Sequence, residues 1–303
     1  MYPALLRSVV SPPYTRERIN TPDGDFLDLD WCQNDNSHLV IICHGLEGNS
    51  QRTYVTGMAR IFGVNNFDIL AWNYRGCSGE TNLKPYSYHS GATYDLESVV
   101  RHAIVKGYNK ISLIGFSLGG NLVLKYLGEE TTQKFDEIVS AVVFSVPVDL
   151  LSCAIQIHEP SNFLYERRFL NSFHQKVIDK SARFDEVDGS KWKQVKSVFD
   201  FDEYYTAPLS GFKDARDYYE KCSSINFIQG IKIPTLVVNA LNDPFLGPEC
   251  FDPTEFEKSS IVNFELPQQG GHCGFPLFGK NGSYWSELKA LEFIQVSDGS
   301  KTF

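Results

Sequence analysis

The sequence predicts an α/β fold, in which a mostly parallel sheet is covered by helices on both faces and interrupted by a helical insertion. Two observations predict it. Short apolar runs alternate with amphipathic helices along most of the 303 residues, a pattern typical of parallel sheets. The alternation stops between Pro147 and Ile231, where only irregular helices are expected. We therefore expect a core of residues 1–146 and 232–303 and a helical cap of residues 147–231.

The chain before residue 110 is expected to form a hairpin and then alternating strands and helices. The hairpin spans residues 16–31 and turns at Pro22-Asp23-Gly24. Its second arm alternates apolar residues with Asp28 and Asp30, which is the pattern of a half-buried strand. Apolar runs predict buried strands, and apolar residues at helical spacing predict the helices between them. These elements are strands 38–43 and 68–73 and helices 54–62 and 93–106.

The stretch Lys110 to Leu127, KISLIGFSLGGNLVLKYL, combines a buried strand, a turn and a helix. Its turn matches the G-x-S-x-G nucleophile elbow in the required strand–turn–helix context, with Ser117 at the centre. The strained turn needs residues without bulk two positions before and after the serine, which Gly115 and Gly119 provide. The helix that follows directs backbone N–H groups toward charge forming beside the serine. Ser117 is therefore the candidate nucleophile.

The rest of the chain is expected to supply three strands, four cap helices and a last helix. The expected strands are 138–146, 235–239 and 261–266, the cap helices are 162–173, 184–187, 195–205 and 214–222, and the last helix is 284–294. The cap is rich in aromatic residues. We expect most of them to pack in the cap itself and a few to line a pocket above the elbow.

A serine hydroxyl needs a base within hydrogen-bond reach, and the base needs an acid that orients it. In folds with this elbow the chain order is serine, acid, histidine. His272 follows the last expected strand in a glycine-rich loop and is the candidate base. Asp243 follows strand 235–239 and is the candidate acid. Asp149, after strand 138–146, is the alternative acid and could instead be a helix N-cap.

An oxyanion formed at the serine needs two hydrogen-bond donors. The backbone N–H of Leu118, directly after the nucleophile, is one candidate. The loop after strand 38–43 should provide the second, and the N–H of Leu46 is our candidate. His44 in that loop precedes Ser117 in the chain and is expected to shape the loop rather than act as a base. Arg75 is expected to be a structural ion-pair partner.

The composition of the chain limits the kinds of partner that we expect it to bind. A net charge of −9 argues against nucleic acid or an anionic membrane surface as the main partner. The seven cysteines are scattered without CxxC or zinc-type spacing, so we expect no metal and no disulfide framework. The first residues do not form a signal peptide or a transmembrane segment, which favours a cytoplasmic protein.

Several motifs resemble those of the α/β-hydrolase superfamily, and more narrowly those of its YheT-like branch of esterases, related to abhydrolase-domain lipases and yeast medium-chain acyltransferases. The motifs are HGLEG, NYRGCSG, GFSLGGN, FDEYYTAPLSGF, NALNDPF and GGHCGF. The resemblance implies an α/β-hydrolase fold and a serine esterase without a cofactor, with Ser117, Asp243 and His272 as its catalytic triad. The family usually has two acids before the Pro-Phe pair. Here the first is Asn242, and we take the second, next to the proline, as catalytic.

The expected reaction is hydrolysis of a carboxylic ester with an apolar short- or medium-chain acyl group, because the cap is aromatic and few charged clusters lie near the elbow. Two alternatives remain open. The same triad could transfer the acyl group to an alcohol, or the chain could be a non-catalytic binding protein on a hydrolase fold. Dehalogenase and epoxide hydrolase chemistry need a carboxylate at the elbow, so Ser117 argues against both.

Overall fold

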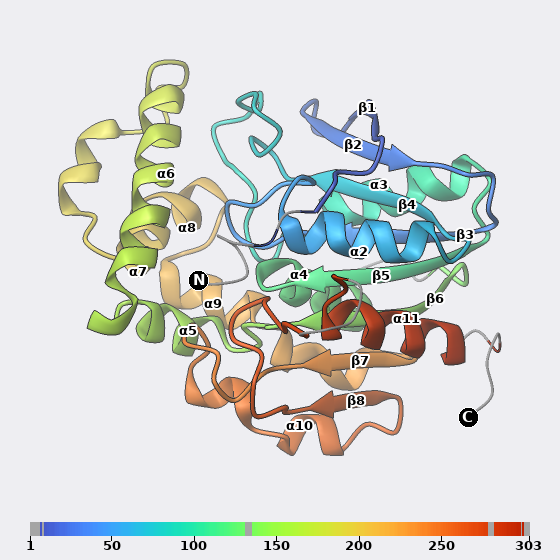
Figure 1. The fold of residues 1–303 in the computed structure, drawn as a ribbon. Coiled ribbons are helices and arrows are strands. Elements are labelled where there is room, and N and C mark those ends of the chain that lie inside the picture. Colours follow the sequence, from blue (N-terminus) through green and yellow to red (C-terminus); the bar gives the residue numbers. More distant parts are fainter. Residues whose placement is uncertain (1–6, 8, 131–134, 278–281, 298, 300–303) are drawn as a thin grey trace.

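The computed structural model describes residues 7, 9–130, 135–277, 282–297 and 299 (Figure 1). In this part of the chain the strands form one eight-stranded sheet in the order β1-β2-β4-β3-β5-β6-β7-β8. From β4 to β8 all neighbours are parallel, whereas β1 and β2 pair antiparallel at one edge. The strands are β1 (Thr15–Asn20), β2 (Phe26–Cys32), β3 (His38–Cys43), β4 (Asp68–Asn73), β5 (Lys110–Phe116), β6 (Ile138–Phe144), β7 (Thr235–Val238) and β8 (Val262–Glu265). The predicted α/β architecture is confirmed.

Helices cover both faces of the sheet, which explains why its central strands are apolar throughout. On β3, Leu39 and Ile41 pack on one face, and Val40 and Ile42 pack on the other. The first face is covered by α3 (Thr93–Val105) and α4 (Leu118–Gly128), and the second by α2 (Thr53–Gly63) and α11 (Trp285–Ser297). Two short elements, η5 (Pro248–Phe251) and α10 (Thr254–Glu257), lie between β7 and β8.

The expectation that β2 is half-buried is wrong. Asp28 and Asp30 are almost completely buried, with 3% and 2% of their surface exposed. Their partners on β1 cover them, because Arg18 Nε lies 2.8 Å from Asp28 Oδ1 and Arg16 Nη2 lies 2.7 Å from Asp30 Oδ2. Each arginine stands directly across the ladder from its aspartate. The alternation of apolar and acidic residues therefore marks an ion-paired face, not a solvated one.

Arg75 lies in a buried ion cluster, as expected for a structural residue. Its guanidinium donates to Asp95 Oδ1 at 2.6 Å, Asp23 Oδ2 at 2.7 Å and Asp25 Oδ2 at 3.0 Å. Only 1% of the Arg75 side chain is exposed. The cluster fastens the β1–β2 turn to the loop after β4 and to α3.

The described residues between β6 and β7 form helices joined by loops, with no strand. They are α5 (Leu150–Ile157), η1 (Pro160–Asn162), α6 (Phe163–Ser181), η2 (Gly189–Gln194), α7 (Val198–Phe201), η3 (Asp202–Thr206), α8 (Ala207–Leu209), α9 (Ala215–Cys222) and η4 (Ser224–Gly230). Figure 1 shows the arrowheads of β5, β7 and β8 pointing toward the group formed by α6, α7 and α8. The helical insertion therefore lies at the carboxyl ends of the strands, where α/β sheets carry their sites. None of the helices among the described residues is both long and apolar enough to span a membrane.

Three details of the insertion differ from the expectation. Helix α6 continues to Ser181, beyond the predicted end at residue 173, because the buried residues Val177 and Lys180 extend its core-facing side. The predicted helix at 184–187 is a single turn closed by Val187 N–H on the Phe184 carbonyl. Helix α5 is not among the predicted cap helices, but the side chain of Asp149 caps its first turn, which is the alternative role expected for that residue.

Candidate active site

Ser117 stands between the end of β5 and the start of α4 with positive φ (φ 53°, ψ −122°). Such a conformation costs a non-glycine residue about 1–3 kcal/mol and is typical of functional sites. Gly119 is required here, because a Cβ at this position would lie 2.4 Å from the Cys43 carbonyl oxygen. A Cβ at Gly115 would lie 2.6 Å from the Gly119 carbonyl oxygen. The strand–turn–helix geometry and the need for both glycines are as the sequence predicted.

The structure brings the three predicted residues together. His272 Nε2 lies 2.9 Å from Ser117 Oγ, and His272 Nδ1 lies 2.9 Å from Asp243 Oδ2 and 3.0 Å from Oδ1. The alternative acid, Asp149, is elsewhere: its Oδ1 accepts the N–H of Ser152 at 2.8 Å and caps α5. The carboxylate that contacts His272 is therefore Asp243.

The surroundings of His272 favour the protonated form of its imidazole. The Asp243 side chain is fully buried, and its Oδ1 also accepts the backbone N–H of Phe245 at 3.0 Å. Partial burial lowers the pKa of His272, but the Asp243 carboxylate and Cys273 outweigh this and raise the pKa well above its ordinary value. An imidazole in this environment binds a proton readily, which is what a base acting on a hydroxyl must do.

Asn242 is a functional candidate that the sequence did not identify as one. Its Oδ1 accepts the backbone N–H groups of Gly270 and Gly271, both at 2.9 Å, and its Nδ2 donates to Gln269 Oε1 at 2.8 Å. These residues directly precede His272. The side chain beside the acid therefore holds the loop that carries the imidazole. The only signal in the sequence was its departure from the family pattern.

The loop after β3 is held rigidly beside Ser117. His44 Nδ1–H donates to the Gly45 carbonyl at 2.8 Å, and His44 Nε2 accepts the N–H of Tyr74 at 3.3 Å. Burial lowers the pKa of His44 to about 3, so its ring is neutral. The loop-shaping role expected for His44 is confirmed. The loop also places Leu46 on the wall of the cavity that Leu118 lines, and the Leu118 N–H belongs to the first turn of α4, whose N–H groups have no partner within the helix.

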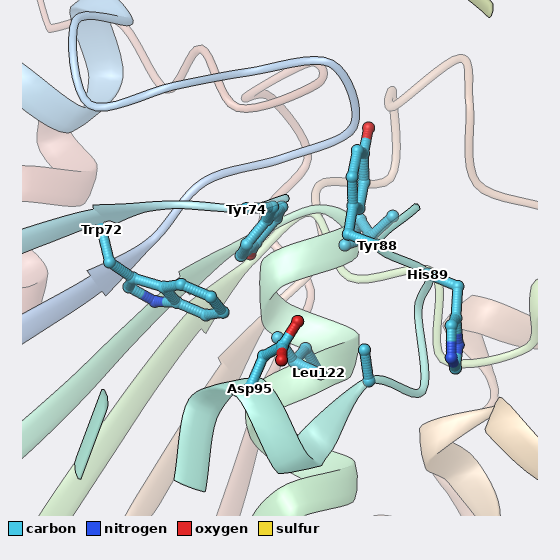
Figure 2. Close-up of a pocket in the computed structure, with 8 residues that line it drawn as sticks. Trp72, Tyr74, Tyr88, His89, Asp95 and Leu122 are labelled. Atoms are coloured by element: carbon cyan, nitrogen blue, oxygen red, sulfur yellow. The ribbon is translucent and has the colours of Figure 1, made fainter. Parts of the chain in front are cut away.

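A column of aromatic rings supports this loop from behind. Figure 2 shows Tyr74 between Trp72 and Tyr88, with ring centroids 4.6 Å and 5.2 Å from its neighbours. The Tyr74 hydroxyl donates to the His44 carbonyl at 2.7 Å. The small void beside these rings, which Figure 2 shows bordered by His89 and Leu122, has no room for a water molecule. The column is therefore packed and does not form a second ligand site.

A cavity of about 1030 Å³ opens above Ser117 and His272. Six cap aromatics contribute to its wall: Tyr165, Phe169, Phe173, Phe201, Tyr218 and Tyr219. Other cap aromatics, among them Phe184, Trp192 and Tyr204, pack around a buried cluster of Val177, Val187, Val195 and Tyr205. Among the described residues, no cluster of histidine, cysteine and acidic side chains could hold a metal ion.

Comparisons with known proteins agree with this fold. Residues 38–277 match the family described as "alpha/beta hydrolase fold". The chain is 31% identical to the YheT esterase of Escherichia coli, over 91% of this chain and 82% of that one. It is also 31% identical to phospholipase ABHD3 of Mus musculus, over 89% and 69%. A Pyrococcus furiosus esterase structure superposes with a TM-score of 0.64 at 18% identity, covering 98% of this chain and 97% of that one. The chain belongs to the α/β-hydrolase fold family.

Proposed function

We propose that this ester hydrolase works through an acyl-enzyme on Ser117, with His272 as general base and acid and Asp243 as the residue that orients it. The observation that carries the proposal is the unbroken contact from Ser117 Oγ to His272 Nε2, 2.9 Å, and from His272 Nδ1 to Asp243 Oδ2, 2.9 Å. A hydroxyl paired with an oriented imidazole is the arrangement that activates serine as a nucleophile. The names of the relatives, an esterase and a phospholipase, support ester cleavage.

The proposed reaction has two halves. Ser117 Oγ attacks the ester carbonyl carbon while His272 Nε2 takes the hydroxyl proton, and the carbonyl electron pair moves onto its oxygen. The tetrahedral intermediate collapses by breaking the bond to the alcohol oxygen, which receives the proton from His272. Water then attacks the acyl-enzyme in the same way and releases the carboxylic acid. No metal or cofactor takes part.

The negative oxygen of the intermediate would be stabilised by the backbone N–H groups of Leu46 and Leu118. Both residues line the cavity beside Ser117. The dipole of α4, whose first residue is Leu118, adds a positive potential at the same place. One such donor typically contributes a factor of about 10² to 10³ in kcat.

We further propose that residues 147–231 act as a cap that selects an apolar acyl group. The cavity is large enough for a chain of several carbons, and aromatic rings of α6 and α7 line it. Each methylene that fits contributes about 0.8 kcal/mol, so kcat/KM should rise severalfold per carbon until the pocket is full. Hydrolysis of p-nitrophenyl esters should therefore increase from acetate to a short or medium chain and then decrease. A steady fall from acetate onward would contradict the apolar pocket.

Covalent labelling tests the nucleophile. A fluorophosphonate probe should label the native protein, and Ser117→Ala should abolish both labelling and ester hydrolysis. Cys153→Ala, which alters a buried thiol on the cavity wall without touching the hydroxyl, is the matched control and should keep its labelling. Equal labelling of native protein and Ser117→Ala would remove Ser117 as the nucleophile. Absence of labelling and turnover in the native protein would favour a binding protein instead.

A further inference from the structure

Glu47 follows Leu46 in the loop that lies beside Ser117, and its backbone is held on both sides. It has positive φ (52°), although it is not a glycine. Its N–H donates to the Tyr88 hydroxyl at 2.9 Å, and its carbonyl accepts from Arg52 Nη2 at 2.7 Å. The position of the Leu46–Glu47 segment therefore depends on what holds Glu47.

The Glu47 side chain connects this loop to cap helix α6. Its Oε1 accepts the Tyr88 hydroxyl at 2.6 Å and Lys176 Nζ at 2.5 Å, and its Oε2 accepts the hydroxyl of Ser172. Ser172 and Lys176 are four residues apart on α6 and therefore lie on one side of it. More than 120 residues of sequence separate Glu47 from these two partners. One carboxylate thus joins the core loop and the cap.

The ion pair is shielded from solvent, since only 11% of the Glu47 side chain and 21% of the Lys176 side chain are exposed. Burial raises the pKa of Glu47, but Lys176 and the hydroxyls of Ser172 and Tyr88 outweigh this and lower it. The ammonium of Lys176 also lies 4.9 Å from the centre of the Tyr88 ring. Apolar side chains could hold two elements together as strongly as a buried ion pair. What the pair adds is a fixed direction and distance between the cap helix and the loop.

We infer that Glu47 is a positioning residue through which α6, by way of Lys176 and Ser172, holds the Leu46 N–H at the oxyanion of the intermediate. The inference rests on the proposed ester hydrolysis at Ser117. Seating of α6 on Glu47 completes the oxyanion hole, and displacement of α6 releases it. Glu47 lines the cavity, and its hydrogen bonds among the described residues go to Tyr88, Arg52, Ser172 and Lys176, so its role in this proposal is to position Leu46.

The test separates transition-state stabilisation from substrate binding. Glu47→Gln and Lys176→Met should each lower kcat by about ten- to a hundredfold, a part of the loss expected for one oxyanion donor, with KM for a p-nitrophenyl ester nearly unchanged. The inhibition constant of a trifluoromethyl ketone, which forms a serine-bound oxyanion, should rise by the same factor. The double variant Glu47→Gln/Lys176→Met should lose no more than either single variant, because both act through one contact. Ser172→Ala, which keeps the ion pair, should show a smaller loss of the same kind.

Lys180→Met is the matched control. Lys180 lies one turn further along α6 and donates to the backbone carbonyls of Lys84, Pro85 and Tyr86, so it also fastens the helix to the core. Because Lys176 and Ser172 still hold Glu47 in this variant, the ratio of the ketone inhibition constant to KM should stay unchanged. Native-like kinetics in Glu47→Gln and Lys176→Met, or an equal change of that ratio in Lys180→Met, would overturn the inference. Failure of the native protein to hydrolyse any ester would instead reject the proposed function.

Discussion

Replacing Gly119 by alanine tests whether the elbow and the loop after β3 must lie as close together as they do. The new methyl carbon would lie 2.4 Å from the carbonyl oxygen of Cys43 and 2.5 Å from that of His44. Ordinary contacts of this kind begin near 3.4 Å, so one of the two segments has to move by about 1 Å. Neither moves freely: Cys43 is paired with Gly115 in the sheet, and the His44 carbonyl accepts the Tyr74 hydroxyl.

Two effects should follow from this displacement. Overpacking of this kind typically costs about 1–3 kcal/mol of unfolding free energy. A shift of about 1 Å between Leu118 and Leu46 would also separate the two proposed oxyanion donors, and a misplacement of that size can cost about a hundredfold in rate. We therefore expect Gly119→Ala to lower kcat/KM by about two orders of magnitude while the protein remains folded. Steady-state hydrolysis of a p-nitrophenyl ester and urea unfolding measure the two effects.

Gly63→Ala is the matched control for this experiment. Gly63 is the last residue of α2, and a Cβ there would meet no atom within 4 Å. Alanine should leave activity unchanged and stabilise the helix by up to about 1 kcal/mol. Full activity of Gly119→Ala would refute the argument that this glycine keeps the two donors together. A loss of activity that merely follows the fraction of unfolded protein would refute it as well.

Two further predictions concern the base. Asp243→Asn should lower kcat by about three to four orders of magnitude, and it should move the acid limb of the kcat/KM–pH profile to lower pH. The direction of this shift follows from the groups around His272. The Asp243 carboxylate raises the pKa of the ring and burial lowers it, so without the carboxylate the ring loses its proton at lower pH. An unmoved limb would contradict this. Asn242→Ala removes the acceptor for two N–H groups at an exposed position, worth about 0.5 kcal/mol each, so kcat should fall roughly fivefold. Asn242→Asp keeps that acceptor and should stay within about twofold, and an equal loss in both variants would exclude the proposed hydrogen bonding.

The parts of the fold that could be predicted depend on local pattern. Strands 38–43 and 68–73 have the predicted bounds, because in each case a run of apolar residues is buried on both faces and stops where the chain turns. The elbow could be predicted because its strain requires glycine at two fixed positions around Ser117. The chain order of serine, acid and histidine then identified His272, which contacts Ser117, and Asp243, which contacts His272.

The parts that could not be predicted depend on partners far away in the sequence. The length of α6 was underestimated because Lys180 occupies a core-facing position and is satisfied by carbonyl groups almost a hundred residues earlier. The acidic face of β2 was predicted to be solvated because the arginines that cover it belong to the neighbouring strand. Asn242 follows β7 and holds the loop of His272, which follows β8, and no sequence motif near Asn242 indicates this contact. The spacing of apolar residues in the sequence indicates which face of an element is apolar, but it does not indicate which polar groups will contact each other.

Helix α6 links the two halves of the proposed machinery. At its start, Tyr165 packs against Phe245 with ring centroids 4.6 Å apart, beside the backbone that holds Asp243. In its middle, Lys176 binds Glu47 beside the proposed oxyanion donor. Tyr165 and Lys176 are eleven positions apart on the helix, a rise of about 16 Å, so one rigid element spans the mouth of the site. A tilt of α6 that keeps Tyr165 packed on Phe245 must strain the contact between Lys176 and Glu47. A tilt that keeps the Lys176–Glu47 contact must in turn strain the packing of Tyr165 on Phe245. The cap, the triad and the proposed oxyanion donors should therefore respond to a substrate as one unit. Because polar contacts act over a short distance, the contact of Lys176 with Glu47 should be lost first when α6 is displaced.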